Sequence, residues 1–337
     1  MDPFADLLDG VRARTAAFCQ AVLEPPWALR IADGAPLALV MTMRGQAWVV
    51  PDGGEPVHLR TGDVALVKGL APYTVADDPA TVPTVVVLPE DRLRTTEGVD
   101  VTDELLRAWR SAGAGADGTT VVASGTYRVT GDVTARLLSA LPSVVLVRRA
   151  EVEGPVMSLL GSEVGRDGPG QQVLLDRLLD LALIETLRAW FARPGSAAPG
   201  WYRAQGDAVA GPALRALHDD PARPWTVAEL AADVGCSRAA LARRFTTLVG
   251  EPPMTYLRDW RIALAADLLR STDLTVDAIA RRVGYANPFA LSVAFKRARG
   301  TSPARHRAGD AAVPPAREPG GGDSSRPRAQ PASVVPS

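Results

Sequence analysis

The residue types that usually carry enzymatic or metal chemistry are few in this chain. Its 337 residues include three histidines, His58, His218 and His306, and two cysteines, Cys19 and Cys236. A metal site needs several imidazole, thiolate or carboxylate ligands that converge, and nucleophilic catalysis needs a nucleophile next to a base. Because these five residues are scattered singly along the chain, we predict no catalytic residues, no metal site and no cofactor. The expected protein is not an enzyme.

Basic side chains are the functional groups that do gather in one part of the chain. Residues 1–220 carry 20 Lys and Arg against 28 Asp and Glu, whereas residues 221–308 carry 14 against 7. The net charges are therefore −8 and +7, and residues 309–337 are balanced at 3 against 3. Neutralising phosphates supplies most of the nonspecific affinity of proteins for DNA. A basic module next to an acidic one therefore predicts double-stranded DNA as a partner.

The basic module is built from one pattern that occurs twice. The two copies are offset by 49 residues up to Gly284 and by 50 after one inserted residue near Ala286. The matched positions are Thr226, Val227, Leu230, Ala231, Val234, Gly235, Ser237, Leu241, Phe245, Gly250 and Pro253 in the first copy and Thr275, Val276, Ile279, Ala280, Val283, Gly284, Asn287, Leu291, Phe295, Gly300 and Pro303 in the second. Self-similarity at a fixed spacing indicates a duplicated structural unit.

Each copy is predicted to be a short helix, a tight glycine turn and a second helix. Thr226 followed by Glu229 forms a capping box that starts the first helix, and Gly235 ends it. Ser237 caps the next helix, and Asn287 does the same in the second copy. Two helices joined by a short glycine-containing turn are typical of the helix-turn-helix, whose second helix enters the DNA major groove. Ordinary helical hairpins share this layout, but the duplication and the positive charge favour DNA binding.

The whole of residues 225–307 resembles the AraC/XylS-type transcription regulators. The segments that carry the resemblance are Pro224–Val227, Gly235–Arg238, Phe245, Gly250–Pro253, Tyr256–Leu257, Trp260–Arg261, Ile279–Ala280, Val283–Tyr285, Ala294–Arg297 and Gly300–Pro303. The resemblance implies two helix-turn-helix units joined by a long helix, here Met254–Arg270, that holds the recognition helices about 34 Å apart on successive major-groove segments. It also implies an activator or a repressor of transcription, with RNA polymerase as a further partner in the case of an activator.

Helical spacing and the resemblance together select the DNA-contacting side chains. The predicted DNA-binding residues are Arg238, Ala239, Ala242, Arg243, Arg244 and Thr246 on the first recognition helix and Asn287, Phe289, Ser292, Val293, Lys296, Arg297 and Arg299 on the second. We expect Arg243 to read bases, because a guanidinium can bond O6 and N7 of guanine together. Arg238 and Arg244 are expected to contact phosphates or to be solvated. The family often has a polar or basic residue at the position of Val293. The second unit is therefore expected to clamp the backbone, with Lys296, Arg297 and Arg299 on phosphates.

The first half of the chain has the texture of a β-barrel or sandwich, with short apolar runs separated by turn residues. The predicted strands are Leu37–Met43, Gln46–Val50, Val57–Leu59, Val64–Val67, Tyr73–Val75, Val82–Leu88, Val121–Val122, Gly125–Val129 and Val144–Val147, with a helix at Ala135–Leu141. The positions that resemble the cupin barrel in the sensor half of many regulators are Gly45, Gly62-Asp63, Lys68-Gly69 and Pro72-Tyr73. The predicted fold class is α+β, with an N-terminal cupin-like β-barrel with flanking helices and a C-terminal all-α double helix-turn-helix domain.

The cupin resemblance does not extend to a metal centre. Metal-binding cupins present a His-x-His pair, a carboxylate and a further histidine, whereas His58 stands alone here and Tyr73 occupies a position where a histidine is expected. A barrel without a metal can still enclose a small molecule. We therefore expect a small-molecule effector. The candidate ligand-binding residues are Trp27, Arg30, Met41, Met43, Trp48, His58 and Tyr73, although each is individually more often a core or surface residue.

Shifts in composition divide the chain. The predicted parts are a cupin-like sensor and dimerisation domain at 1–200, with its barrel at about 27–147 and a long helix at about 171–193, a connector at 201–224, the double helix-turn-helix domain at 225–307, and a disordered tail rich in Pro, Gly and Ser at 308–337. Apolar residues at helical spacing also predict a helix within residues 2–23. The long helix has two interpretations, which are packing on its own barrel and contact with a second copy in a homodimer.

The chain lacks the sequence features of export or membrane insertion. It contains no run of about 18 apolar residues, and Asp2, Asp6 and Asp9 make its start acidic where a secretory signal is basic. We therefore predict a cytoplasmic protein without a membrane role. Three other functions stay open as weaker hypotheses: a ligand-independent regulator controlled by a protein partner or by its expression level, a cupin-type enzyme with a DNA-binding appendage, and a redox switch at Cys19.

Overall fold

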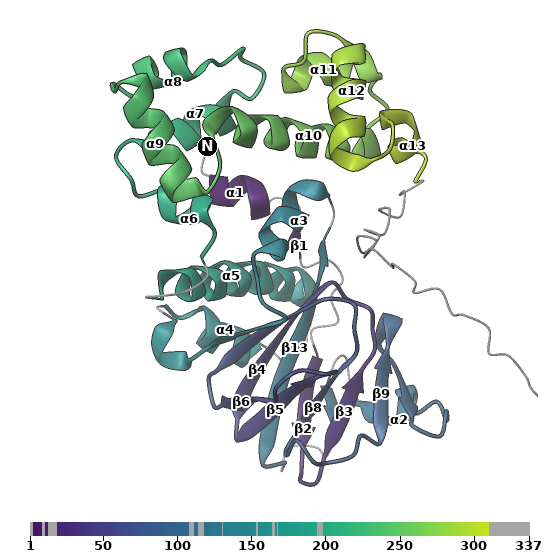
Figure 1. Cartoon of the computed structure of the whole chain (residues 1–337). Helices are drawn as coiled ribbons and strands as arrows, with labels where there is room; N and C mark the ends of the chain where they lie inside the picture. The colour runs from purple at the N-terminus through teal and green to yellow at the C-terminus, as the bar shows by residue number, and fades with distance from the viewer. Residues whose placement is uncertain are drawn as a thin grey trace, which may run out of the picture.

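The chain forms a two-sheet sandwich followed by helices (Figure 1). One long helix, α10 (Pro253–Ser271), joins the helices that precede it to the short helices that follow it. The computed structural model describes residues 3–8, 11–12, 19–107, 111–113, 118–129, 131–152, 154–163, 166, 168–193 and 198–309. Residues 310–337 of the tail predicted at 308–337 lie outside the described residues. The α+β class predicted from the sequence is confirmed.

The sandwich consists of a larger and a smaller sheet. In spatial order the larger sheet contains β11 (Leu106–Arg107), β12 (Ser111–Gly113), β2 (Cys19–Leu23), β13 (Thr120–Val129), β4 (Leu37–Arg44), β7 (Val64–Lys68) and β14 (Val144–Val147), and β1 (Val11–Arg12) pairs with β13. The smaller sheet contains β10 (Arg92–Thr95), β9 (Val85–Leu88), β3 (Ala28–Ile31), β8 (Tyr73–Ala76), β5 (Gln46–Pro51) and β6 (Val57–Arg60). Among the described residues no strand belongs to both sheets, so the sandwich is not closed into a barrel.

The central strand β4 shows why the first half folds in layers. Ala38 and Val40 pack between the two sheets, whereas Leu37 and Leu39 pack against helices on the other face. Successive side chains of a strand point to opposite faces, so a strand covered on both sides has a continuous apolar sequence. The larger sheet is therefore the middle layer of the first half.

The helices α4 (Val156–Glu163) and α5 (Gln171–Ala192) cover the outer face of the larger sheet, and α3 (Asp132–Ser139) lies between this part of the molecule and α10 (Figure 1). The hydroxyl of Tyr127 in β13 donates a hydrogen bond to the carbonyl oxygen of Leu179 at 2.8 Å, which ties α5 to the sheet. One face of α5 is thus packed on its own sandwich, as one of the two interpretations of this helix predicted. Its other face leaves Val173, Leu174 and Leu181 exposed.

The remaining helices form the connector and the C-terminal part. They are α6 (Gly200–Ala204), α7 (Ala210–Asp219), α8 (Val227–Asp233), α9 (Arg238–Val249), α10, α11 (Val276–Val283), α12 (Pro288–Arg299) and α13 (Pro303–Arg307). The helix predicted at Met254–Arg270 is α10, and the two predicted helix-turn-helix units are α8–α9 and α11–α12. The short helices α1 (Pro3–Leu8) and α2 (Thr102–Leu105) complete the set among the described residues.

Two separate apolar cores hold the two helix-turn-helix units. Leu241 and Phe245 of the first unit belong to a core that continues through the connector to the helices on the sandwich. Leu291 and Phe295 of the second unit belong to a smaller core, shared with α10 and α11. The first unit is therefore part of the main body of the molecule, whereas the second is packed chiefly on α10.

Sequence and structure differ at the N-terminus. The sequence pattern predicts a helix within residues 2–23, but α1 ends at Leu8 and Cys19–Leu23 form the strand β2. The second half of that prediction is wrong, because β2 pairs with β13 on one side and with β12 on the other. Sheet pairing overrides a helical apolar spacing when the residues can also fit a strand.

Candidate nucleic-acid interface

Side-chain caps fix where the helices of both units begin. Oγ1 of Thr226 accepts a hydrogen bond from the amide of Glu229 (3.1 Å), and Oε2 of Glu229 accepts one from the amide of Thr226 (2.9 Å), so the predicted capping box is present. Ser237 caps α9 and Asn287 caps α12, each by accepting a hydrogen bond from the amide three residues later, at 3.2 and 2.8 Å. The amide oxygen of Asn287, a predicted DNA contact, is therefore engaged within its own helix.

Glycine makes the turn of each unit. Gly235 after α8 has a φ of 71°, and Gly284 after α11 has a φ of 89°. These left-handed conformations strain residues that carry a Cβ atom, so glycine occupies the same place in both copies. The two sharp turns set the angle at which α9 and α12 leave the preceding helices.

The first recognition helix, α9, buries one face and exposes the other. Leu241 and Phe245 are fully buried. Of the predicted contacts, Arg238, Ala239, Arg243 and Arg244 are exposed, and Ala242 and Thr246 are half-buried. Among the described residues Arg243 has no hydrogen-bond or ion-pair partner, so its guanidinium is free to meet a ligand.

The second recognition helix, α12, exposes two large apolar side chains, and one of them, Val293, takes the position that Arg243 has on α9. Phe289 and Val293 are 76% and 53% exposed, and Leu291 and Phe295 are buried beneath them. Among the other predicted contacts, Asn287, Lys296 and Arg297 are exposed, whereas Ser292 and Arg299 are half-buried. The outward orientation predicted for these helix faces is confirmed, whereas contact with DNA stays a prediction.

Two of the predicted phosphate contacts are held by carboxylates in this structure. Arg244 donates to Oδ2 of Asp207 from Nε (2.8 Å) and Nη2 (2.6 Å), and this hydrogen bonding lowers the pKa of Asp207 to about 2. Nη1 of Arg299 lies 3.2 Å from Oδ1 of Asp132 in α3. A DNA phosphate would therefore compete with a carboxylate for either arginine.

The joining helix α10 sets the spacing of the two units. Its 19 residues span about 28 Å at 1.5 Å per residue. One face of α10 packs inward: Tyr256, Leu257 and Trp260 are buried, and Leu264 and Leu268 are half-buried. The α10 helix therefore has the length and the packing of a spacer between two recognition helices.

A buried histidine joins α10 to the connector and to the start of the chain. Nδ1 of His218 lies 2.8 Å from Oδ2 of Asp6, and its Nε2 lies 2.8 Å from the hydroxyl of Tyr256. A carboxylate only accepts, so Nδ1 carries the proton and Nε2 of the neutral ring accepts from the tyrosine. Burial lowers the pKa of His218, and the hydrogen bond to Asp6 opposes this only in part.

A second set of contacts between α10 and the first half involves the carboxylates of Asp267 and Asp132. Oδ1 and Oδ2 of Asp267 accept hydrogen bonds from the amides of Asp132 (2.5 Å) and Val133 (3.1 Å), so α10 supplies the N-terminal cap of α3. Asp132 in turn lies 3.0 Å from Nη2 of Arg270 in addition to its ion pair with Arg299. Burial raises the pKa of Asp267, and its hydrogen bonds from the two amides oppose this shift. No sequence signal indicated these contacts, because the partners are more than 130 residues apart.

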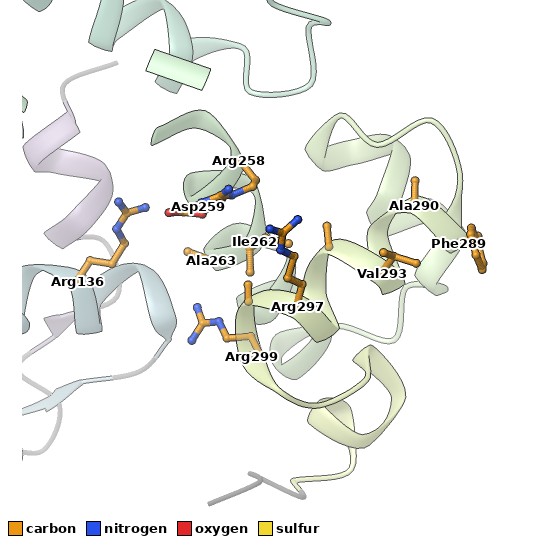
Figure 2. A pocket seen from close by; sticks show the side chains of 12 residues that line it. Arg136, Arg258, Asp259, Ile262, Ala263, Phe289, Ala290, Val293, Arg297 and Arg299 are labelled. Carbon is orange, nitrogen blue, oxygen red and sulfur yellow. Dashed lines mark hydrogen bonds and ion pairs between the residues drawn. The ribbon is translucent and has the colours of Figure 1, made fainter. Parts of the chain in front are cut away.

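A groove of about 920 Å³ lies next to α12 (Figure 2). Phe289, Val293 and Arg297 line one side, and Arg258 of α10 and Arg136 of α3 line the other. Arg136 and Arg258 are absent from the predicted set. The exposed position of Arg258 follows from the helical spacing of α10, whereas only the folded chain brings Arg136 to this place.

The seven candidate effector contacts lie in three separate places. Trp27 and Tyr73 are buried between the sheets. Met41 and Met43 face the helices on the other side of the larger sheet. The other three are on the outer face of the smaller sheet, where Arg30 pairs with Asp52 (2.6 Å) and Trp48 stacks on His58 with ring centroids 4.5 Å apart. The structure therefore does not bring the seven residues together around one cavity.

The described ranges contain neither a cluster of potential metal ligands nor a helix that could span a membrane. There, no group of three His, Cys, Asp or Glu side chains is placed to hold a metal ion. None of the described helices is long and apolar enough to cross a membrane. The thiol of Cys236 is free and half-buried in the turn between α8 and α9, and the side chain of Cys19 lies outside the described part.

Comparisons with known proteins agree with this architecture. A family model described as Cupin matches residues 2–192, and one described as Helix-turn-helix domain matches residues 230–309. A Streptomyces lividans protein named as an AraC-like transcription regulator is 33% identical over 317 residues, which cover 91% of this chain and 98% of that protein. A Streptomyces antibioticus protein of the same name is 32% identical over 312 residues, with the same coverage of both chains.

A solved structure is similar to the C-terminal part. The DNA-binding domain of the transcriptional factor AdpA, solved in complex with a target DNA, is 36% identical to this chain. The match covers 31% of this chain and 93% of that domain, with a TM-score of 0.29.

Proposed function

The chain belongs to the AraC-type family of DNA-binding transcription regulators, and we propose that its first helix-turn-helix unit selects the DNA sequence while its second unit mainly holds the DNA backbone. One observation carries this division. The exposed face of α9 presents the unpaired guanidinium of Arg243, whereas the equivalent position on α12 presents the apolar side chain of Val293. A guanidinium can distinguish guanine from the other bases by two hydrogen bonds, and a valine offers only a methyl contact.

The test of this division uses the full-length chain and DNA selected from a random duplex library. Arg243→Ala is expected to lose about 1–3 kcal/mol on the selected sequence and much less on a scrambled sequence, because it removes a bidentate base contact. Equilibrium binding to both duplexes at one salt concentration measures the specificity ratio.

The matched control is Arg238→Ala, which removes the same charge from the exposed start of α9. A phosphate contact is insensitive to sequence, so this variant should weaken both duplexes by the same factor. A wild-type specificity ratio in Arg243→Ala shows that this arginine does not read bases.

We further propose that the first half senses a signal and passes it to the DNA-binding helices. The contacts of α10 with His218 and with α3 support this coupling, because they connect the sandwich physically to both units. The effector itself rests on the cupin-type fold alone, since its candidate residues do not converge. Thermal-shift screening of the full chain tests for it, because a ligand at about 100 times its Kd adds about 2.7 kcal/mol of stability. A screen without any shift favours control by a protein partner or by expression level.

A homodimer and RNA polymerase are the remaining proposed partners. The outer surface of the α4–α5 pair supports a homodimer, since Leu159, Val173, Leu174 and Leu181 are 40–61% exposed there. Sedimentation over a range of protein concentrations measures the oligomeric state. RNA polymerase is a partner if the chain activates transcription, and in vitro transcription from the selected DNA distinguishes an activator from a repressor. Catalysis is not part of the proposed function.

A further inference from the structure

The groove next to α12 carries far more positive than negative charge. Its arginines are Arg136, Arg258, Arg297 and Arg299, and its one acidic side chain is Asp259. The floor between them is apolar, with Ile262 and Ala263 of α10. Positive charges that line a concave surface strengthen one another's potential and attract anions.

Two of these guanidiniums have a carboxylate within hydrogen-bonding or ion-pair distance. Nε of Arg258 donates to Oδ1 of Asp259 at 2.8 Å, and Arg299 lies 3.2 Å from Asp132. Both pairs are partly exposed, and such pairs contribute little energy. They can exchange with an incoming anion at little cost.

The other two guanidiniums are poorly paired. Among the described residues Arg297 has no ion-pair partner. The carboxylate near Arg136 is that of Glu251, at 3.7 Å, and the Arg136 guanidinium lies over the ring of Tyr256, 5.3 Å from the centroid. The Arg136 side chain is 29% exposed, so the accessible part of its guanidinium can meet a phosphate oxygen.

The position of the groove identifies the anion. Its outer wall is the exposed face of α12, formed by Phe289, Val293 and Arg297 (Figure 2). A recognition helix in the major groove lies between two sugar-phosphate backbones, so a strand of DNA runs along each side of it. We propose that one of these strands follows the groove and that Arg136, a residue of the sensor half, binds its phosphates together with Arg258 and Arg297.

This assignment, which rests on the proposed function, gives the sensor half a direct contact with DNA. Arg136 lies on α3, the helix whose N-terminus is capped by Asp267 of α10. A movement of α3 along α10 would carry Arg136 toward or away from the phosphates. The same helix would therefore transmit a change in the sandwich to the affinity for DNA.

The experiment measures how DNA binding by the full-length chain depends on salt. The probe is a duplex of about 30 base pairs and arbitrary sequence, three turns long. Each phosphate contact adds about 0.9 to the slope of log Kobs against log salt, so Arg136→Gln should flatten the slope by about 0.9 and weaken binding about eightfold at 0.1 M salt relative to 1 M. Arg258→Gln should flatten it in the same way.

Three variants separate phosphate binding from a docking role of Arg136. Arg136→Lys keeps the charge and should keep the wild-type slope. Glu251→Gln removes the neighbouring carboxylate without removing the arginine, so it should keep the slope as well. Arg92→Gln removes a charge from the exposed surface of β10 and should leave the slope unchanged.

An unchanged slope in Arg136→Gln overturns the assignment and leaves the groove to a small anion. A flattened slope in Glu251→Gln overturns it too, because the effect would then arise from domain docking. These results are distinct from a failure of the proposed function, in which the wild-type chain itself does not bind the duplex. If the wild type binds and Arg243→Ala changes the specificity while Arg136→Gln changes nothing, only this groove assignment is lost.

Discussion

The two helix-turn-helix units share a sequence pattern but are held in the molecule in different ways. The buried residues of α8–α9 belong to a core that runs through the connector to the sandwich, whereas those of α11–α12 belong to a core of their own with α10. The hydrogen-bonded His218 joins the N-terminal end of α10, which lies next to the first unit, to the connector and to α1. Ion pairs of Asp132 join the C-terminal end of α10 and the second unit to α3. Duplicated sequences can therefore acquire different mechanical roles when they lie against different neighbours.

This difference agrees with the division of labour proposed for DNA binding. A unit that reads bases must hold its side chains in fixed positions, and the core that the first unit shares with the connector and the sandwich helices provides that rigidity. A unit that holds the backbone needs charge more than precise placement. The second unit, with its separate core and ionic contacts, can adjust to the DNA without disturbing the sandwich.

The largest expected effect comes from truncating the equivalent buried phenylalanines. Phe245→Ala and Phe295→Ala each remove a fully buried ring, which costs about 3–5 kcal/mol. Phe245→Ala should lower the stability of the sandwich as well, because the core is continuous. Phe295→Ala should raise hydrogen exchange mainly in α11 and α12. Hydrogen exchange resolved by peptide measures both variants, and an identical pattern for the two would refute the idea of separate cores.

A smaller effect is expected at the histidine that anchors the first unit. His218→Phe leaves Asp6 and the hydroxyl of Tyr256 without their partner and should cost about 1–3 kcal/mol at neutral pH. Because burial lowers the pKa of folded His218, the unfolded chain binds the proton more readily. This residue's contribution is complete above the ordinary pKa of 6.5 and is lost as the pH falls below it.

Denaturant unfolding at a series of pH values measures this contribution. His218→Phe should therefore lose less stability than the wild type between neutral and acidic pH. Tyr256→Phe, which removes the hydrogen bond but keeps the imidazole, is the matched control and should retain an acid-dependent loss. An acid dependence in His218→Phe that equals the wild type would assign the effect to other groups.

The smallest effect is expected at the ionic contact of the second unit. Asp132→Asn removes the carboxylate near Arg270 and Arg299, both partly exposed, and should cost no more than about 1 kcal/mol. The variant should increase hydrogen exchange in α11–α12 and leave α8–α9 unchanged. High salt should reproduce this change in the wild type, because ions screen partly exposed pairs.

Asp103→Asn is the matched control for this change. It removes an exposed acidic group from the first turn of α2, away from the helix-turn-helix units. A larger exchange in α8–α9 than in α11–α12 for Asp132→Asn would mean that the ion pairs support the first unit instead.

Much of the fold could be predicted because its signals are local. The capping box at Thr226 and the glycine turns at 235 and 284 depend on residues within one or two helical turns, so they appear in the sequence itself. The strands with the clearest alternation or apolar runs were found within a few residues of their ends. The edge strand β10 and the inner strand β3 are absent from the predicted set, because their sequence patterns are weak and pairing determines them.

For the candidate DNA interface, the sequence predicted only which side chains lie on the exposed faces of the recognition helices. The exposure of Phe289, Val293 and Arg243 follows from the 3.6-residue period, which fixes which side chains oppose the buried ones. The pairing of Arg244 with Asp207 and of Arg299 with Asp132 joins residues far apart in the chain, and no local pattern records such contacts.

The sequence by itself determined the repeated unit, its caps and turns, the charge division and the faces of the recognition helices, because each depends on neighbours along the chain. The tertiary structure alone decided which unit joins the main core and which arginines are already paired. It alone also decided that Arg136 of the first half lines the same groove as residues of the second recognition helix. The physical reason is that packing and ion pairing depend on distances in space. Two stretches that share one sequence pattern can therefore have one local structure and two different environments.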